Sequence, residues 1–323
     1  MGPDRGGRAV WPCNRPQPAA ARPGGEGRAA RVTGARATEG AALAHRAGML
    51  WRIATFNIRH GRGLDGRVDL EGIRRVLERA SPHWAGLQEV DGGRRRSGRV
   101  HQARWLGMAL GRAWFFHPTL HRGGAYGLCW LGPPVPPAGS GVVAVEAQPL
   151  PSRWEPRACL WLRVSGFGPQ DEPAWLGVTH LGLGAAERRA QARALAEQAA
   201  RLRQEGPVVL VGDFNAPAEA PELAPLRAVL ASAAAARAQA PATYPATGGA
   251  GGEPCWVVAA GGGSSRGAGG SGGGPRRGDR EGAPQSGPAI DLIWVAGLRV
   301  VELQVLDHGA SDHRLVQAVL GCL

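Results

Sequence analysis

The chain has 323 residues, 43% of them apolar, which is enough to bury a core in one large domain or two smaller ones. Its 38 basic residues, all arginine, exceed 26 acidic ones and give a net charge of +12. A GC-rich genome explains an arginine-only bias better than function does, so nucleic-acid binding does not follow from charge alone. The positive balance still suits a phosphate-bearing substrate.

Cysteine usage and hydropathy exclude several protein classes. The five cysteines are scattered, odd in number and without CxxC spacing, which argues against a disulfide framework or a zinc site. No run of about 18 apolar residues is present, so the sequence predicts no transmembrane helix. We therefore expect a cytoplasmic protein.

The first 48 residues differ in composition from the rest. They are rich in Arg, Gly, Ala and Pro without periodicity, which predicts disorder. Met49 stands directly before the first strand-like run, and our hypothesis is that Met49 is the true start and that the preceding segment is a gene-calling artefact. A single catalytic domain is predicted over residues 49–323.

The first half of that domain alternates strands with short helices. LWRIATFNI predicts a strand ending at Asn57, and a helix capped by Asp69 follows and ends at Pro82. WAGLQEV at 84–90 predicts a second buried strand. An arginine-rich loop, a helix at 102–110 and strands at 126–131 and 140–147 are expected next.

The second half is richer in strands. The runs at 157–166 and 174–182 indicate a hairpin, and 185–205 is an amphipathic helix ended by Gly206. A Gly/Ser/Arg-rich stretch at 248–288 predicts a surface loop inserted in the domain. Strands are expected from 208 to Gly212 and at 289–295, 298–306 and 313–321. Many strands with few helices predict an antiparallel-rich α/β sandwich.

The stretch VVLVGDFNAP at 208–217 organises the functional prediction. Its four aliphatic residues predict a buried strand, and Asp213 and Asn215 follow two residues apart at the end of that strand. Open α/β sheets place their chemistry at the carboxyl ends of strands.

Polar residues end five of the predicted strands, and a Ser-Asp-His turn adds a sixth site: Asn57, Glu89, His180, Asp213 with Asn215, Asp291, and Ser311-Asp312-His313. Each has an ordinary structural explanation when taken alone, as a turn cap, an ion pair or a half-buried histidine. Six such sites beside hydrophobic runs point together to one active site.

The residue types suit phosphate-ester hydrolysis. Asn57 and Glu89 offer hard oxygen ligands, which fit Mg²⁺ or Mn²⁺ better than zinc. Asp213 is placed to orient or deprotonate water, and Asn215 to donate to the phosphate. His313 would contact the phosphoryl oxygen or the leaving group, its tautomer held by Asp291.

The motifs TFNIRHG, GLQEVD, THLGL, VVLVGDFNAP, IDLIWV and SDHRLV resemble, in order, those of the endonuclease/exonuclease/phosphatase family over about residues 50–320. The resemblance implies a four-layer α/β/β/α sandwich with two facing mixed, mostly antiparallel β-sheets, and a divalent-metal phosphohydrolase site between their loops. By motif match, Asn57 and Glu89 would hold the metal with Asp312 close by. By the same match, Asp213 and Asn215 would be the catalytic pair. Asp291 and His313 would form a carboxylate–histidine dyad, and His180 would contact the phosphate.

Departures from the family pattern occur around Tyr126, where Leu128 and Gly132 replace polar residues in a substrate-facing loop. They keep open a second hypothesis, a non-catalytic phosphate- or nucleic-acid-binding module with a degenerate site. A third hypothesis, an acyl hydrolase, is set aside because no GxSxG segment follows a predicted strand and opens a helix, as a nucleophile elbow requires.

We therefore predict a Mg²⁺-dependent phosphoesterase, nuclease-like or phosphodiesterase-like, that acts by direct attack of water. The NIRHG and LQEVD segments resemble the branch with lipid-headgroup hydrolases, so a phosphatase or phosphodiesterase acting on inositol or lipid head groups is an alternative. A monomer acting on a phosphoester substrate, nucleic acid included, is expected.

Overall fold

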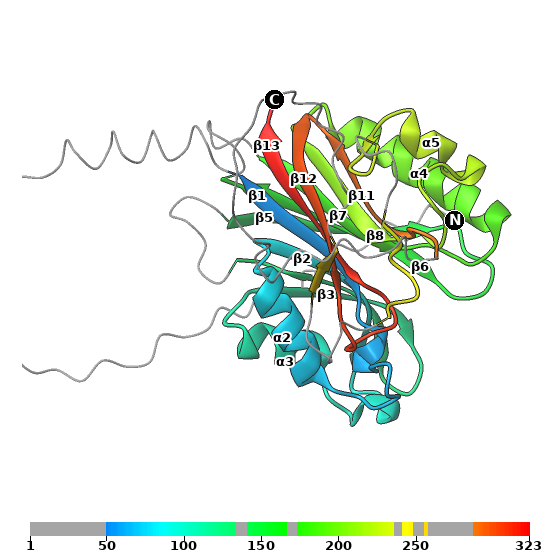
Figure 1. The fold of residues 1–323 in the computed structure, drawn as a ribbon. Coiled ribbons are helices and arrows are strands. Elements are labelled where there is room, and N and C mark those ends of the chain that lie inside the picture. The colour runs from blue at the N-terminus through cyan, green and yellow to red at the C-terminus, as the bar shows by residue number, and fades with distance from the viewer. Residues whose placement is uncertain (1–49, 134–140, 167–172, 236–240, 248–254, 258–286) are drawn as a thin grey trace, which may run out of the picture.

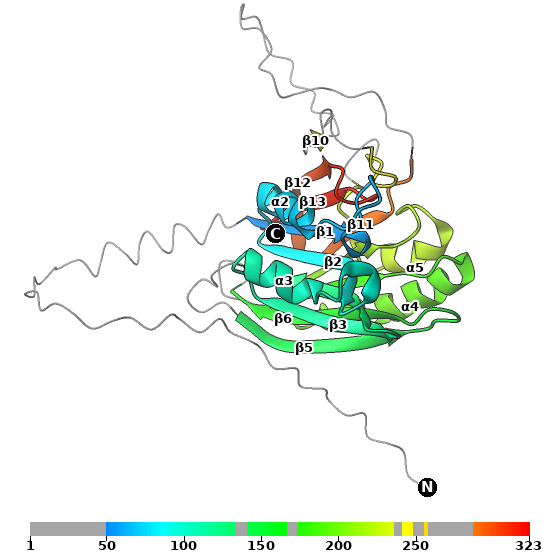
Figure 2. The same ribbon diagram turned by 90° about the horizontal axis from the view of Figure 1, so that it is seen from below.

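Two β-sheets packed face to face organise the chain in the computed structural model, which describes residues 50–133, 141–166, 173–235, 241–247, 255–257 and 287–323. One pair of helices covers the outer face of each sheet (Figures 1 and 2). The predictions for residues 1–48, for Met49 and for most of 248–288 lie outside the described residues.

The first sheet has seven strands in the order β10-β12-β13-β1-β2-β4-β3. Their bounds are Cys255–Val257 (β10), Leu298–Asp307 (β12), Leu315–Cys322 (β13), Trp51–Asn57 (β1), Trp84–Gly92 (β2), Ala125–Leu131 (β4) and Trp114–His121 (β3). The strands β1 and β2 run parallel, and the other described pairs in this sheet are antiparallel.

The second sheet has six strands in the order β5-β6-β7-β8-β11-β9. They span Gly141–Leu150 (β5), Arg157–Ser165 (β6), Ala174–His180 (β7), Val208–Asp213 (β8), Asp291–Ala296 (β11) and Ala231–Ser232 (β9). Here β7 and β8 are parallel, while β6 and β7 form the antiparallel pair expected from the sequence.

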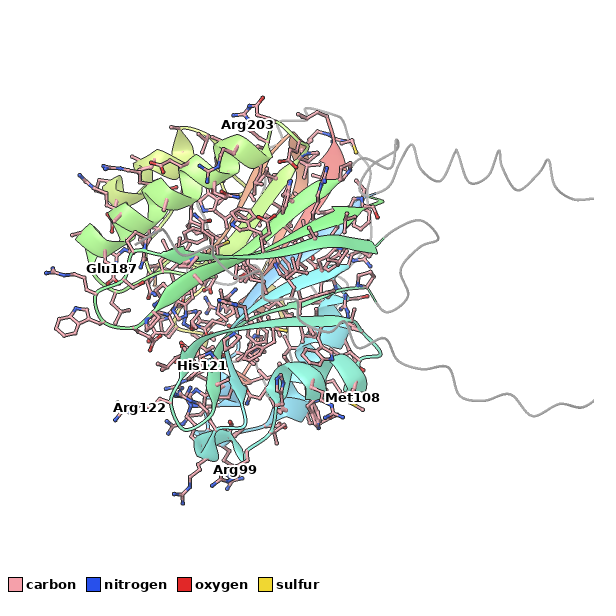
Figure 3. The ribbon with its side chains drawn as sticks, turned by 180° about the vertical axis from the view of Figure 1, so that it is seen from behind. Arg99, Met108, His121, Arg122, Glu187 and Arg203 are labelled. Carbon is pink, nitrogen blue, oxygen red and sulfur yellow. The ribbon has the colours of Figure 1, made fainter. Side chains whose placement is uncertain are left out.

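The helices complete four layers, as the family resemblance implied. α2 (Leu70–Ala80) and α3 (Gln102–Ala109) pack on the first sheet, and α4 (Ala185–Leu202) with the short α5 (Ala224–Arg227) packs on the second. Exposed Met108 on α3 and exposed Arg203 after α4 mark the two opposite outer faces in Figure 3. The three-residue 3₁₀ segments are η1 (Arg59–Gly61), η2 (Arg95–Ser97) and η3 (Pro221–Leu223).

Alternation along the strands decides which side chains enter the space between the sheets. On β8, Val209 and Val211 belong to the core between the sheets, whereas Val208 and Leu210 pack under α4. Because side chains alternate with a period of two, Asp213 points to the same inner face as Val211. The apolar pattern of β8 therefore aims this carboxylate at the opposite sheet.

Three features of the fold differ from the sequence prediction. β3 was not expected, since Pro118 lies within it; the strand lies at the edge of its sheet, where a missing N–H is tolerated. β10 lies in the stretch predicted to be a loop, and its backbone pairs with β12. α4 ends at Leu202, β11 begins at Asp291 and β13 begins at Leu315, so these elements are shorter than predicted.

The helices that the structure describes are amphipathic or short, and none of them has the length and hydrophobicity that a membrane-spanning segment requires.

Gly86 of β2 is a close-approach point between the sheets. A Cβ placed there would lie 2.6 Å from a methyl of Val211 and 3.0 Å from one of Val178. Because the core is close-packed, we expect Gly86→Ala to lower the free energy of unfolding by about 1–3 kcal/mol. Urea denaturation measures the change. Gly141→Ala is the matched control, since a Cβ at Gly141 meets nothing within 4 Å; equal stability of the two variants would contradict the close packing.

Candidate active site between the two sheets

Three predicted site residues form a row across the second sheet. Asp213 at the end of β8 is paired in register with His180 at the end of β7 and with Asp291 at the start of β11. All three are nearly fully buried. Thr243 fixes the start of β11, because its hydroxyl accepts the backbone N–H groups of Ile290 and Asp291 at 2.9 and 3.0 Å. The row is thus set by strand register.

The first sheet supplies Asn57 and Glu89 opposite this row. Asn57 ends β1 and is fully buried. Glu89 lies in a β-bulge of β2, where the register with β4 shifts between Leu87 and Val90 and Glu89 has a φ of 58°. The bulge places two residues opposite one on β4, so Val90 can still face α2 and α3 while Glu89 reaches Asn57.

The Asn57 side chain connects the two sheets. Its Nδ2 donates to Glu89 Oε1 at 3.1 Å and to Asp213 Oδ2 at 3.0 Å, while its Oδ1 accepts from the backbone N–H of Arg59. The amide therefore presents its nitrogen, not its oxygen, to the two carboxylates. In this arrangement Asn57 holds Glu89 and Asp213 in place.

Asp213 also lies between two imidazoles. Its Oδ2 is 3.4 Å from His180 Nε2 and 3.7 Å from His313 Nε2. The other side of the His313 ring meets Asp291, with Nδ1 3.0 Å from Oδ2 and 3.2 Å from Oδ1. The carboxylate–histidine pair predicted from the sequence is therefore formed, and Nε2 of His313 is directed toward Asp213.

These contacts set different protonation preferences. Burial lowers the pKa of His180 to about 3, helped by the positive charge of Arg157, so His180 is neutral at pH 7. For His313, burial opposes protonation, but the Asp291 carboxylate raises the pKa to about 10. Burial and the Asp291 charge raise the pKa of Asp213 above its usual range. The cluster therefore holds one neutral and one protonated imidazole beside a carboxylate with raised basicity.

Glu89 behaves differently from Asp213. Burial alone would raise its pKa, but contacts with His60 and Asn57 contribute to holding it at about 2. Its Oε2 is 3.9 Å from His60 Nδ1, too far for a hydrogen bond, and no arginine pairs with it among the described contacts. A half-buried, ionised carboxylate without a cationic partner in hydrogen-bonding range is a candidate cation ligand.

The remaining predicted residues lie at the rim. Asn215 adopts a left-handed conformation; its backbone N–H donates to Asp213 Oδ1 at 2.9 Å and its Nδ2 donates to the Leu181 carbonyl. Asp312 pairs with Arg59, Nε to Oδ2 3.1 Å, instead of contacting Glu89. Ser311 donates to the Asn57 carbonyl at 2.7 Å and so ties the Ser-Asp-His turn to β1.

A family model described as the Endonuclease/Exonuclease/phosphatase family matches residues 54–313. The chain belongs to this family. Hydrolysis of phosphoester bonds is the chemistry of its members, and the matched range contains every residue of the site described above.

Solved structures show the same fold. A functionally unknown conserved protein from Enterococcus faecalis V583 superposes with a TM-score of 0.62 and 17% identity, covering 84% of this chain and 100% of that one. A mannosyl-6-phosphatase from Bacteroides thetaiotaomicron gives 0.59 and 16%, covering 84% and 99%. D. rerio TDP2 complexed with single-strand DNA product gives 0.58 and 14%, with the same coverage. No curated protein sequence matches the chain significantly.

One group of potential metal-binding residues in this family member differs from the predicted set. Ligand atoms of Asp213, Asp291 and His313 lie within 4.8 Å of one another, all buried. Their mutual contacts already use the Asp291 oxygens and His313 Nδ1, and His313 favours the protonated form. Because a metal-binding imidazole must be neutral, this group suits proton handling better than metal binding.

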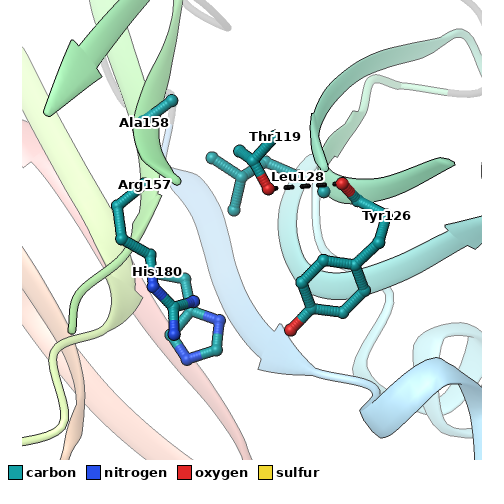
Figure 4. Close-up of a pocket in the computed structure, with 7 residues that line it drawn as sticks. Thr119, Tyr126, Leu128, Arg157, Ala158 and His180 are labelled. Atoms are coloured by element: carbon teal, nitrogen blue, oxygen red, sulfur yellow. Dashed lines mark hydrogen bonds between the residues drawn. The ribbon is translucent and has the colours of Figure 1, made fainter. Parts of the chain in front are cut away.

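Sequence reasoning missed several residues at the site. Arg59 and His60 both have positive φ, 44° and 46°, beside Asn57. The half-exposed Tyr244 packs its ring against His313 with 4.7 Å between centroids. Arg157 approaches His180 from β6 (Figure 4). Clustering of left-handed non-glycine residues marks strain at functional sites, but it is visible only in the fold.

The Asn57–Asp213 contact predicts a measurable coupling between the sheets. The double variant Asn57→Asp/Asp213→Asn exchanges donor and acceptor and keeps an amide–carboxylate hydrogen bond. Asn57→Asp alone sets two carboxylates against each other, and Asp213→Asn alone replaces the charge-assisted hydrogen bond by a weaker one between two amides. We expect the double variant to be more stable than the sum of the two single effects, by about 0.5–3 kcal/mol in urea denaturation. Additive effects would show that the two side chains do not interact.

Proposed function

We propose that this chain is a divalent-metal-dependent hydrolase of phosphoester bonds, of the phosphodiesterase or nuclease-like type, that acts by direct attack of water. One observation carries the proposal: Asp213 lies between His180, His313 and the Asn57 amide, with ionised Glu89 bound to the same amide. In the proposal, Asp213 is the base, His313 the cationic donor and Glu89 the cation ligand around one point between the sheets.

Glu89 is the residue that would hold Mg²⁺ or Mn²⁺. Its donor chemistry fits a hard cation, because it is an ionised carboxylate that receives an amide N–H from Asn57 and no arginine among the described contacts. When bound, the ion would polarise a non-bridging phosphoryl oxygen. We propose Asn57 and Asp312 as supports, through Glu89 and through Arg59; direct ligation by either residue stays a prediction.

Asp213 is proposed to take the proton of the attacking water. Its raised pKa suits a general base, and the backbone N–H of Asn215 fixes its Oδ1, leaving Oδ2 facing the site. As the water oxygen bonds to phosphorus, the ester P–O bond breaks and the leaving oxygen departs. No covalent bond to the chain is needed.

The two histidines have separate roles in this scheme. His313, kept protonated by Asp291, would donate to the developing negative charge on the phosphoryl or leaving oxygen. Neutral His180 would donate one ring N–H to a phosphoryl oxygen without adding charge. The structure thus favours an acid–base pair of Asp213 and His313.

Loss of the Asp213 carboxylate tests the chemical step. We expect Asp213→Asn to reduce kcat on bis-p-nitrophenyl phosphate in Mg²⁺ by about 10²–10⁴-fold with an unchanged far-UV circular dichroism spectrum, because the general base is lost. Wild-type turnover in this variant would refute the assigned role.

Glu89→Gln tests the metal site. The neutral amide binds hard cations less well, so we expect the Mg²⁺ concentration for half-maximal activity to rise at least about tenfold, with partial rescue by Mn²⁺. Glu197→Gln, an exposed position on α4, is the matched control and should leave the metal dependence unchanged. An unaltered metal requirement in Glu89→Gln would make Glu89 a structural residue.

The two alternatives from the sequence give other outcomes in the same assays. Activity confined to inositol phosphates or lipid head groups would favour the headgroup hydrolase. Phosphate or nucleic-acid binding without turnover would favour a binding module with a degenerate site. The buried Asp213–His313–Asp291 arrangement argues against the second, since a binding module has no use for a carboxylate of raised pKa.

A further inference from the structure

A small pocket, partly open to solvent, lies beside the site and is lined from both sheets (Figure 4). β3 and β4 contribute Thr119, Tyr126 and Leu128, and β6 and β7 contribute Arg157, Ala158 and His180. His180 belongs both to this pocket and to the contact with Asp213, 3.4 Å from Nε2 to Oδ2. The pocket therefore adjoins the proposed reaction centre.

Arg157 gives the pocket a positive charge. Its side chain is only 11% exposed, and its Nη1 pairs with Glu155 at 3.1 Å, a residue whose own side chain is 39% exposed. Figure 4 shows the guanidinium beside the His180 ring. The residues described as lining the pocket include no carboxylate, and His180 is neutral. Glu155, outside the lining, offsets part of the Arg157 charge, and the guanidinium N–H groups that do not pair with Glu155 are the donors offered to an anion.

Tyr126 faces Arg157 across the pocket. Its ring is buried, and its hydroxyl points toward the side where Arg157 and His180 lie (Figure 4). The guanidinium carbons of Arg94 and Arg96 lie 5.5 and 5.3 Å from the Tyr126 ring centroid. Arg96 is paired with Asp91, whereas Arg94 donates to the backbone carbonyl of Arg122, which leaves its charge in place.

The surrounding surface has the same sign. Exposed Arg99 and Arg122 lie near the η2 segment and in the β3–β4 hairpin (Figure 3). Positive charge on the wall of a partly buried pocket attracts anions, and a guanidinium matches phosphate oxygens.

We propose that this pocket binds a second phosphate of the substrate, beside the phosphoryl group that reacts, with Arg157 and the Tyr126 hydroxyl as its donors. The inference rests on the proposed phosphoester hydrolase function and names its preferred substrates, those with two phosphates close together. The second phosphate has two sources with the same chemistry, the neighbouring phosphate of a nucleic-acid strand or a polyol bisphosphate.

Binding is measured by calorimetry in an Asp213→Asn background, so that ligands are not consumed, at fixed free Mg²⁺. One pair of ligands is 1,3-propanediol bisphosphate and n-propyl phosphate; the other is the dinucleotide dTpdT with and without a 5′-phosphate. We expect the second phosphate to tighten binding at least about tenfold in one pair or both, and the pair that responds identifies the source.

Further substitutions, each made in the Asp213→Asn background, show which side chains bind the second phosphate. Arg157→Gln should abolish the gain from the second phosphate, Arg157→Lys should retain part of it, and Tyr126→Phe should reduce it. Arg203→Gln, an exposed arginine after α4 on the opposite face, should keep the full gain (Figure 3). Circular dichroism confirms that each variant is folded.

Two results would overturn the inference: no gain from the second phosphate in either pair, including no binding at all, or a gain that survives Arg157→Gln. Neither result bears on the proposed hydrolase function, because turnover of bis-p-nitrophenyl phosphate by the wild-type chain is measured separately.

Discussion

The amide nitrogen of Asn57 donates to one carboxylate on each sheet, and the geometry of the site depends on this contact. Glu89 and Asp213 are brought together from sheets whose strands do not pair with each other. Two ionised carboxylates so placed repel, and one amide with two N–H donors offsets part of that repulsion. The fold therefore concentrates negative charge between the sheets, directly beside the Asp291–His313 pair.

Backbone strain is concentrated at the same place. Of the six described non-glycine residues with positive φ, Arg59, His60, Glu89 and Asn215 adjoin the site. Left-handed backbone is unfavourable for such residues, and each of these four lies within or shortly after a core strand, β1, β2 or β8, that fixes its position. The result is a set of side chains held before a substrate arrives, which favours electrostatic stabilisation over rearrangement.

Much of this arrangement could be predicted from the sequence, and the features that could not be predicted have a physical reason in common. The aliphatic run of β8 predicted a buried strand with Asp213 and Asn215 at its end, and the ordered motifs predicted both the family and the four-layer fold. Strand register places His180, Asp213 and Asp291 in one row, because they lie at the ends of neighbouring strands. The bulge at Glu89, the Arg59–Asp312 pair and the Arg157 pocket were not predictable, because each depends on contacts between distant segments. The strand β3 was not predicted, because a proline such as Pro118 is compatible only with an edge strand and the position of β3 in the sheet is known only from the fold.

We propose that Glu89 holds the divalent ion and that the Asp213–Asp291–His313 group does not. Asp213 then binds no metal and acts as the base. Anomalous diffraction from crystals soaked in Mn²⁺ tests it most directly. The account predicts one strong anomalous peak within coordination distance of a Glu89 carboxylate oxygen, and none between Asp291 and His313. A peak on the Asp213–Asp291–His313 group, or no peak at Glu89 in saturating Mn²⁺, would contradict it.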